Sequence, residues 1–374
     1  MSNKKVQKRQ AINLPFEIIF SIFTRLPVKS LLRFESVSKS WNAILSDQEF
    51  KKAHHDQSKA LGREKLMLQR TTGHVEFRDL ENCPEISLME EQLFPRFQCA
   101  EILCSCDGLV LLKGGNDYKE YVLWNPSTRE YLVLDSCPYF NGCPKACGLC
   151  YDSKLDEFKV ILICGSSYVV YSSNKRCWTK KTSFPCPVQF FNVDCSEGIS
   201  TGDCVFWSLN WSFINQYVDS STSGIIYLDV KSDEVKKLSV PEFVGANGFF
   251  GLSSLKGCLC LYGGTYHYKE LDIWIMEQDG WKRLMNVCNL PNICIRFVQD
   301  RKLLWRRKNG EILFYGRWNQ QLFIYYPKMK QFATIHSIAD VSEESKNAMA
   351  CICLGSSYFL GLNVEEEVTV PLSA

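Results

Sequence analysis

Cysteine and histidine are the residue types through which this chain could hold a metal or attack a substrate. The sequence contains 19 cysteines and 5 histidines. The densest cysteine group is Cys137, Cys143, Cys147 and Cys150, and four thiolates can enclose a zinc ion. Their successive spacings of 6, 4 and 3 residues do not reproduce the paired CxxC knuckles of structural zinc sites. We therefore predict no metal and no cofactor, with zinc at this cluster as the alternative.

The histidines form no catalytic or metal-binding pattern. None of the five stands at a metal-site spacing or serves a recognisable nucleophile. His54 and His55 lie among lysine and aspartate residues, which is typical of a solvated helix end. The chain also has no GxSxG elbow, no GxxxxGK phosphate loop and no GxGxxG after a predicted strand. The sequence therefore predicts a protein that is not an enzyme.

A second cysteine spacing indicates buried thiols. Three pairs stand two residues apart, namely Cys104 and Cys106, Cys258 and Cys260, and Cys351 and Cys353. On a β-strand this spacing places both side chains on one face, and free cysteine behaves as a small buried hydrophobe. No secretory signal is evident, so we expect core thiols in a reducing compartment, the cytosol or the nucleus.

The composition is that of a folded globular protein. Of the 374 residues, 46% are apolar and 22% are charged, and no apolar run approaches the roughly 18 residues of a membrane span. The formal net charge is +2, and residues 1–10 contain four lysines and arginines, which leaves −2 for the rest. We therefore expect no nucleic-acid surface and no membrane segment, and a disordered basic tail over residues 1–10.

Residues 11–50 carry the helical period. Five apolar residues recur at steps of one, three and four, namely Ile18, Ile19, Ile22, Phe23 and Leu26. Pro15 suits the first turn of this helix, and Pro27 disfavours helix at the residue before it. A second short helix carries Leu31 and Leu32. Ser36 is predicted to cap a third, whose apolar side shows Val37, Trp41, Ile44 and Leu45.

Three helices of about ten residues each cannot enclose all these large side chains. The periodicity leaves open whether the remainder contact a partner or the rest of this chain. The order of the residues also strongly resembles the F-box, the motif that docks substrate receptors onto the Skp adaptor of SCF ubiquitin ligases. The resemblance implies an adaptor-binding set of Leu14, Pro15, Ile18, Ile19, Leu26, Pro27, Leu31, Leu32, Val37, Ser38, Lys39 and Trp41.

Beyond an expected linker over residues 51–65, the pattern changes to strands and turns. Five segments align without gaps: YVLWNPSTREYLVL from Tyr121, YVVYSSNKRCWTKK from Tyr168, IIYLDVKSDEVKKL from Ile225, LDIWIMEQDGWKRL from Leu271 and LFIYYPKMKQFATI from Leu322. Each reads as a β-hairpin with a large residue ten positions after its start, and a further apolar strand precedes each one. A weaker copy lies near Val75.

Repeats of this length, 46 to 57 residues apart, predict a kelch-like β-propeller because a few short strands cannot bury their apolar face alone. We expect about six blades over residues 66–362, a closing strand within residues 350–360, and a tail over residues 363–374. The fold class is thus a small all-α three-helix module followed by an all-β propeller, with a twisted sandwich as the alternative.

The repeats carry a second resemblance. LWNPSTREY at Leu123, CDGLVLL at Cys106 and GLCYDSKLDEFKV at Gly148 are similar to the plant F-box-associated domain, a kelch-like region. The two resemblances imply a noncatalytic substrate receptor that binds the Skp adaptor, and through it a cullin, and presents a target protein for ubiquitination. The alternatives are a scaffold or adaptor competitor without ligase function, and an enzyme with its site in the propeller channel.

The aromatic residues of a long polar excursion are the candidates for target binding. Trp211, Phe213 and Tyr217 lie within residues 210–223, where the repeat departs from its usual length. Exposed aromatic side chains on loops are favoured contact residues. The identity of the target does not follow from the sequence.

Overall fold

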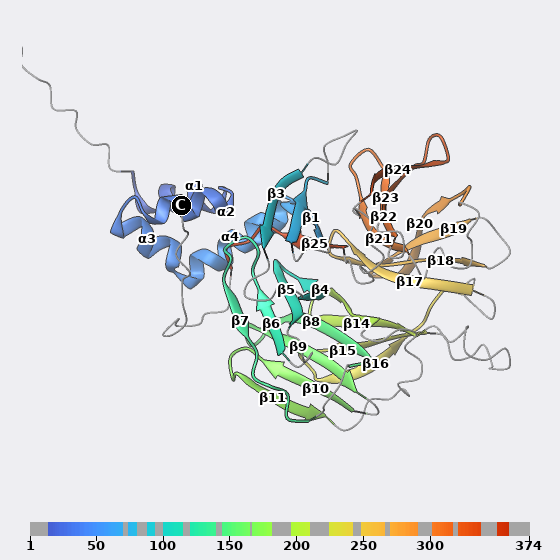
Figure 1. The fold of residues 1–374 in the computed structure, drawn as a ribbon, viewed down its shortest axis with the longest axis horizontal. Helices are drawn as coiled ribbons and strands as arrows, with labels where there is room; N and C mark the ends of the chain where they lie inside the picture. The colour runs from blue at the N-terminus through green and yellow to red at the C-terminus, as the bar shows by residue number, and fades with distance from the viewer. Residues whose placement is uncertain are drawn as a thin grey trace, which may run out of the picture.

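The part of the chain that the computed structural model describes contains four helices followed by a strand-rich body (Figure 1). The structure describes residues 14–69, 74–80, 88–93, 100–114, 120–139, 144–164, 167–181, 196–209, 224–241, 248–265, 270–290, 301–316, 321–337 and 350–358. The expected tails over residues 1–10 and 363–374 lie outside these ranges. Within them, no helix is long and apolar enough to cross a membrane.

The helices follow the proline and polar signals of the sequence. They are α1 (Phe16–Thr24), α2 (Val28–Glu35), α3 (Lys39–Ser46) and α4 (Gln48–Ala60). Pro15 and Pro27 immediately precede α1 and α2. The cap of α3 is Ser38, which accepts a hydrogen bond from the Trp41 backbone N–H at 3.2 Å, so the expectation of a Ser36 cap was wrong. Ser36 instead follows the last residue of α2.

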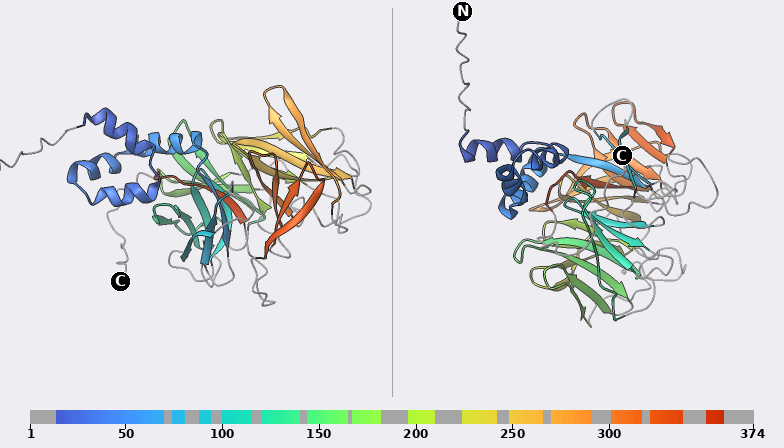
Figure 2. Two further views of the ribbon diagram at one scale, coloured as in Figure 1. Left: turned by 90° about the horizontal axis from the view of Figure 1, so that it is seen from above. Right: turned by 60° about the vertical axis from the view of Figure 1, so that its left-hand side comes forward.

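Helix α4 was not expected. Residues 51–65, interpreted as a linker, provide most of α4 and the start of the first strand. Asp47 caps this helix by accepting a hydrogen bond from the Phe50 N–H at 3.0 Å, and Phe50 is fully buried among the other helices. Figure 2 shows α1, α2 and α3 projecting to one side of the strands, and α4 runs from them toward the propeller.

Six sheets form the body, as the repeats predicted. The first contains β25 (Ala350–Leu354), β1 (Glu64–Gln69), β2 (His74–Arg78) and β3 (Leu88–Leu93). The second contains β4 (Glu101–Cys106), β5 (Leu109–Gly114), β6 (Glu120–Trp124) and β7 (Tyr131–Val133). The third contains β8 (Ala146–Asp152), β9 (Glu157–Cys164), β10 (Ser167–Ser172) and β11 (Cys177–Lys181), with β12 (Ser196–Glu197) added beside β8.

Each of the remaining three sheets contains four strands that are consecutive in the sequence and are hydrogen-bonded in that order. The fourth contains β13 (Ile199–Thr201), β14 (Cys204–Leu209), β15 (Gly224–Asp229) and β16 (Glu234–Leu238). The fifth contains β17 (Gly248–Leu255), β18 (Cys258–Thr265), β19 (Leu271–Glu277) and β20 (Gly280–Val287). The sixth contains β21 (Arg301–Arg306), β22 (Ile312–Gly316), β23 (Gln321–Tyr326) and β24 (Gln331–Ser337). The expectation of about six blades is confirmed, and the sandwich alternative is wrong.

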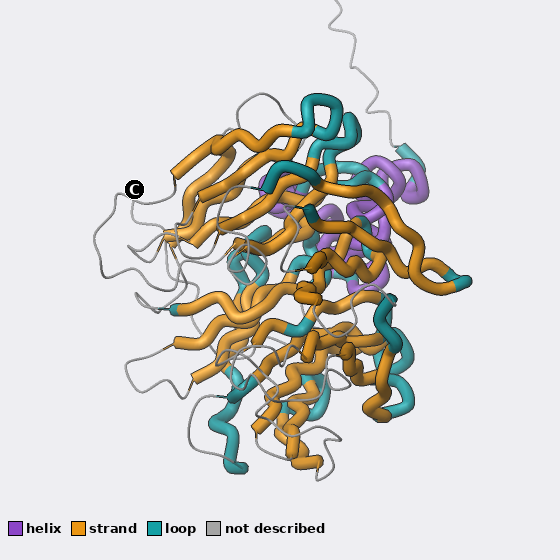
Figure 3. Tube along the Cα trace, turned by 90° about the vertical axis from the view of Figure 1, so that its right-hand side faces the viewer, coloured by secondary structure: helices purple, strands orange, loops and turns teal. Residues whose placement is uncertain are grey.

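The ring closes through strand β25. This strand pairs antiparallel with β1, from Glu64 opposite Leu354 to Leu68 opposite Ala350, so the two ends of the propeller share one blade. The innermost strands β25, β4, β8, β13, β17 and β21 contact one another in a closed circle. Buried side chains fill the spaces between neighbouring blades, and Figure 3 views this strand-rich body from the side away from the helices.

The cysteine predictions had mixed outcomes. Cys351 and Cys353 are both buried in one core cluster, and so are Cys104 and Cys106 in another. Cys260 is buried as well, but Cys258 is exposed because it directly follows the turn at Gly257. The expectation of six core thiols was therefore wrong at one position.

The zinc alternative finds no support in the described part of the cluster. Cys147 and Cys150 pack into two different core clusters, because their spacing of three places them on opposite faces of β8. Cys143 lies outside the described residues. No group of three or more cysteine, histidine or acidic side chains that could hold a metal occurs within the described ranges.

Candidate functional site

The helices expose apolar side chains on their surface. Among the described residues, ten large hydrophobic side chains are exposed, and six of the ten lie in the segment 14–37. These six, which we call the apolar surface, are Leu14 (50% exposed), Phe16 (57%), Ile18 (47%), Ile22 (45%), Leu32 (39%) and Val37 (59%). Such a concentration of exposed apolar side chains in one small module is typical of a protein contact site.

A small core beneath this surface fixes its shape. Phe23, Leu31, Leu45 and Phe50 are buried together and hold the four helices against one another. The Trp41 ring packs edge-on against Phe23, with 5.1 Å between ring centroids. Ile18 and Ile22 are four residues apart on α1 and share one face, so they point away from this core together.

The twelve residues of the expected adaptor-binding set differ in how exposed they are. Seven are exposed, namely Leu14, Pro15, Ile18, Pro27, Leu32, Val37 and Lys39. Four are half-buried, namely Ile19, Leu26, Ser38 and Trp41. Leu31 is only 2% exposed, because it faces the core of the helical module. The expected contact of Leu31 with the adaptor stays a prediction.

Sequence reasoning missed Phe16 and did not assign Ile22 a binding role. Phe16 is the one aromatic member of the apolar surface, and its ring centroid lies 5.9 Å from that of Phe20. The sequence did contain a signal for Ile22: it stands four residues after Ile18, so the two side chains share one face of the helix, and the opposite face packs against the core. The three aromatic candidates Trp211, Phe213 and Tyr217 lie outside the described residues, so their role stays a prediction.

A polar joint connects α4 to the propeller. His54 lies with its Nε2 2.9 Å from the Leu26 carbonyl oxygen and its Nδ1 2.9 Å from the Ser357 hydroxyl. The Nδ1 atom of His55 lies 2.9 Å from the Ser356 hydroxyl. Both histidines are buried, so the expectation of a solvated helix end was wrong. The reason is that residues 355–358, which follow β25, pack directly against α4.

Hydrogen bonds from Asn125 of the propeller and from Arg63, which follows α4, complete the joint. Asn125 is fully buried and donates hydrogen bonds from its amide nitrogen to the carbonyl oxygens of Ser356 (3.1 Å) and Tyr358 (3.0 Å). Arg63 donates to the carbonyl oxygen of Leu26 at 2.7 Å. The Gly355 N–H donates to the Arg63 carbonyl oxygen at 2.9 Å. These bonds tie the first two helices, α4 and the last described residues into one unit.

Burial sets the protonation state of the joint. The pKa of His54 is lowered to about 4, mainly by loss of solvation; the hydrogen bond to Leu26 opposes the shift, and the nearby Arg63 and His55 contribute to it. Burial also lowers the pKa of His55, although Asp107 raises it. Both rings are therefore neutral at pH 7. Lys59 forms an ion pair with Asp107 at 2.7 Å and thereby links the last turn of α4 to the second blade.

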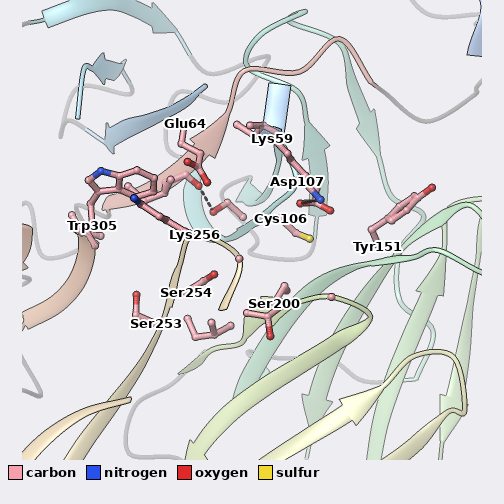
Figure 4. Close-up of a pocket in the computed structure, with 18 of the residues that line it drawn as sticks. Lys59, Glu64, Cys106, Asp107, Tyr151, Ser200, Ser253, Ser254, Lys256 and Trp305 are labelled. Atoms are coloured by element: carbon pink, nitrogen blue, oxygen red, sulfur yellow. Dashed lines mark hydrogen bonds and ion pairs between the residues drawn. The ribbon is translucent and has the colours of Figure 1, made fainter. Parts of the chain in front are cut away.

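A cavity of about 760 Å³ lies at the centre of the propeller, beside the end of α4. Figure 4 shows Lys59 and Asp107 next to each other in its wall, with Cys106 and Tyr151 nearby. The side chains of Lys302 and Glu197, from the sixth blade and the strand beside the third, form an ion pair at 2.6 Å in the lining. Burial raises the pKa of the Cys106 thiol well above its ordinary value, which disfavours the nucleophilic thiolate.

Comparison with known proteins identifies both parts of the chain. The F-box domain family matches residues 12–53, and the F-box associated beta propeller domain family matches residues 74–354. An F-box/kelch-repeat protein of Arabidopsis thaliana is 29% identical over 308 residues, covering 75% of this chain and 81% of that protein. The F-box protein CPR1 of the same plant is 26% identical over 331 residues, covering 80% and 79%. No catalytic family is among the two that match.

Proposed function

Because the chain belongs to the F-box proteins that carry an F-box associated β-propeller domain, we propose that it is the substrate receptor of an SCF ubiquitin ligase. The helical module binds the Skp adaptor, and through it a cullin, and the propeller binds a target protein. The protein makes and breaks no bonds itself. It raises the effective concentration of target lysines near the ubiquitin carrier, in the cytosol or the nucleus.

The apolar surface is the observation that carries this proposal. Its six side chains lie on α1, α2 and the segments beside them, and the propeller does not cover them. Fully burying a leucine or isoleucine is worth roughly 1.5–3 kcal/mol, so burying the exposed half of Ile18 or Ile22 contributes about 1 kcal/mol each. Apolar anchors of this kind contribute more to binding than charges at the rim.

The joint explains how docking positions a target. A receptor increases the rate of transfer only if the bound target stays close to the carrier, which a freely rotating linker does not ensure. In this chain α4 continues from the helical module to the propeller, and buried hydrogen bonds from His54, His55 and Asn125 fix the contact. The adaptor-binding surface and the propeller therefore keep one relative orientation.

Docking is tested by binding of the intact chain to a purified plant Skp adaptor. The double variant Ile18→Ala/Ile22→Ala should lose about 2 kcal/mol, an affinity roughly 30-fold weaker. Met329→Ala is the matched control, because Met329 is 59% exposed in the turn before β24 of the sixth blade, outside the helical module. Equal affinities of the parent and the double variant would contradict the docking assignment.

The receptor role requires transfer as well as docking. A protein that co-purifies with the intact chain is added to a reaction containing the adaptor, the cullin and the ubiquitin enzymes. We expect it to gain ubiquitin with the parent chain and to gain less with Ile18→Ala/Ile22→Ala. Adaptor binding with no transfer to any bound protein would favour the scaffold alternative and contradict the receptor role.

A further inference from the structure

A groove of about 320 Å³ lies between the third and fourth blades. It is lined by the turns after β8, β10 and β15, and the turn after β8 is next to α4, where Lys52 lies 3.4 Å from Asp156. Aliphatic side chains form part of the lining, namely Leu155, Val170, Leu228 and Val230. Leu155 is 51% exposed, so the groove offers an apolar contact that nothing in the described residues covers.

Lysines dominate the charge of the groove. Its lining contains five, Lys154, Lys159, Lys175, Lys181 and Lys231. It contains three acidic residues, Asp152, Glu157 and Asp233, so the lining has a formal net charge of +2.

The ion pairs leave two of these lysines available. Lys159 pairs with Asp152, Lys181 pairs with Asp233, and Lys231 pairs with Asp203. Lys154 and Lys175 are exposed and have no ion-pair partner among the residues that the structure describes. A suitable occupant is therefore an extended segment that carries both carboxylates and aliphatic side chains.

The chain itself supplies such a segment next to the groove. Tyr358, the last described residue, donates a hydrogen bond to Asp156 at 3.0 Å, and Asp156 directly follows Leu155 in the turn that lines the groove. Beyond it the sequence reads Val364-Glu365-Glu366-Glu367-Val368, which has a charge of −3. Glu365 is seven residues from Tyr358, a reach of roughly 23 Å in an extended chain.

We propose that residues 364–368 dock in the groove between the third and fourth blades, with the three glutamates facing Lys154 and Lys175 and the valines beside Leu155. Tethering through Tyr358 gives the segment a millimolar effective concentration, so weak individual ion pairs suffice. While it is docked, the segment excludes other acidic peptides from the groove. This inference does not depend on the proposed function.

Amide hydrogen exchange of the intact chain tests the docking. At low salt the amides of residues 364–368 should exchange at least about fivefold more slowly than at 0.5 M salt, where surface ion pairs are screened. Carbodiimide treatment at low salt should cross-link Glu365, Glu366 or Glu367 to Lys154 or Lys175. Free exchange at every salt concentration, or cross-links only to lysines elsewhere, would overturn the proposal.

Charge-reversal variants separate the groove from the general charge of the surface. Lys154→Glu/Lys175→Glu should abolish the slow exchange, and adding Glu365→Lys/Glu366→Lys/Glu367→Lys should restore it. The matched control is Lys180→Glu/Lys237→Glu, which reverses two exposed lysines of β11 and β16 outside the groove and should leave exchange unchanged. Equal loss in the control, or no recovery on charge exchange, would refute docking at this groove.

Discussion

Acidification should weaken the joint between α4 and the propeller, and His54 allows the effect to be calculated. In the folded chain its neutral ring lies between the Leu26 carbonyl and Ser357, and its pKa is about 4. In the unfolded chain the pKa returns to its ordinary value of 6.5. The pKa of this base is depressed on folding, so its contribution to stability is complete above pH 6.5 and is lost as the pH falls toward 4.

The magnitude follows from the separation of the two pKa values. Each unit corresponds to about 1.36 kcal/mol, so about 2 kcal/mol is lost between pH 7.5 and pH 5.0, where the unfolded chain is protonated and the folded ring is still neutral. His55 acts in the same direction because burial lowers its pKa as well. The charged groups near the two rings are Arg63, Lys59, Asp107 and Asp56, and the two aspartates favour the protonated form.

Urea unfolding of the intact chain at the two pH values measures this effect. His54→Gln removes the titration but keeps an amide that can donate to Leu26 and accept from Ser357. We expect the parent to lose about 2 kcal/mol more than this variant between pH 7.5 and pH 5.0. Met329→Ala, in the exposed turn before β24, is the control and should retain the parent's pH dependence. Identical pH dependences for the parent and His54→Gln would refute the linkage argument.

Three further substitutions test the fold. Lys302→Met removes the buried partner of Glu197 and should destabilise the chain by about 3 kcal/mol in urea unfolding, with partial recovery in the double variant Lys302→Met/Glu197→Gln. Gly198→Ala should lower stability by about 1–3 kcal/mol, measured by the urea midpoint, because an added Cβ would lie 2.7 Å from the Trp207 ring nitrogen. Ser38→Ala removes the cap of α3 and should cost about 1 kcal/mol, measured as a lower urea midpoint with unchanged propeller spectra.

The propeller could be predicted from the sequence because its signal is local and repeated. Each predicted hairpin is present, from the pairing of β6 with β7 to that of β23 with β24. The closing strand was also predicted, and β25 supplies it. The alternation of apolar and polar residues over about five positions indicates which face of a strand is buried. Five repetitions of the same pattern reduce the chance of a coincidental match.

Which face of each helix is buried could not be predicted from the sequence in the same way. Leu31 and Leu32 are adjacent and identical in type, yet Leu31 is buried and Leu32 is 39% exposed. The helical period requires them to face different directions, but it does not say which of the two faces the core. Packing against Phe23 and Leu45 decides this, and those contacts depend on how α1 and α3 cross α2.

Helix α4 was not predicted for a different reason, and the same reason explains how it fixes the helices to the propeller. Its buried residues include His54, His55 and Ser58, so hydrophobic periodicity is weak on the face that is covered. The partners of the histidines are Ser356 and Ser357, about 300 residues away, which no local pattern can reveal. An apolar contact tolerates small rotations, whereas buried hydrogen-bond partners lose energy as soon as they separate. The polar residues that made this joint hard to predict from the sequence therefore also fix the orientation of the helices on the propeller. The same residues make the stability of the joint fall at acidic pH.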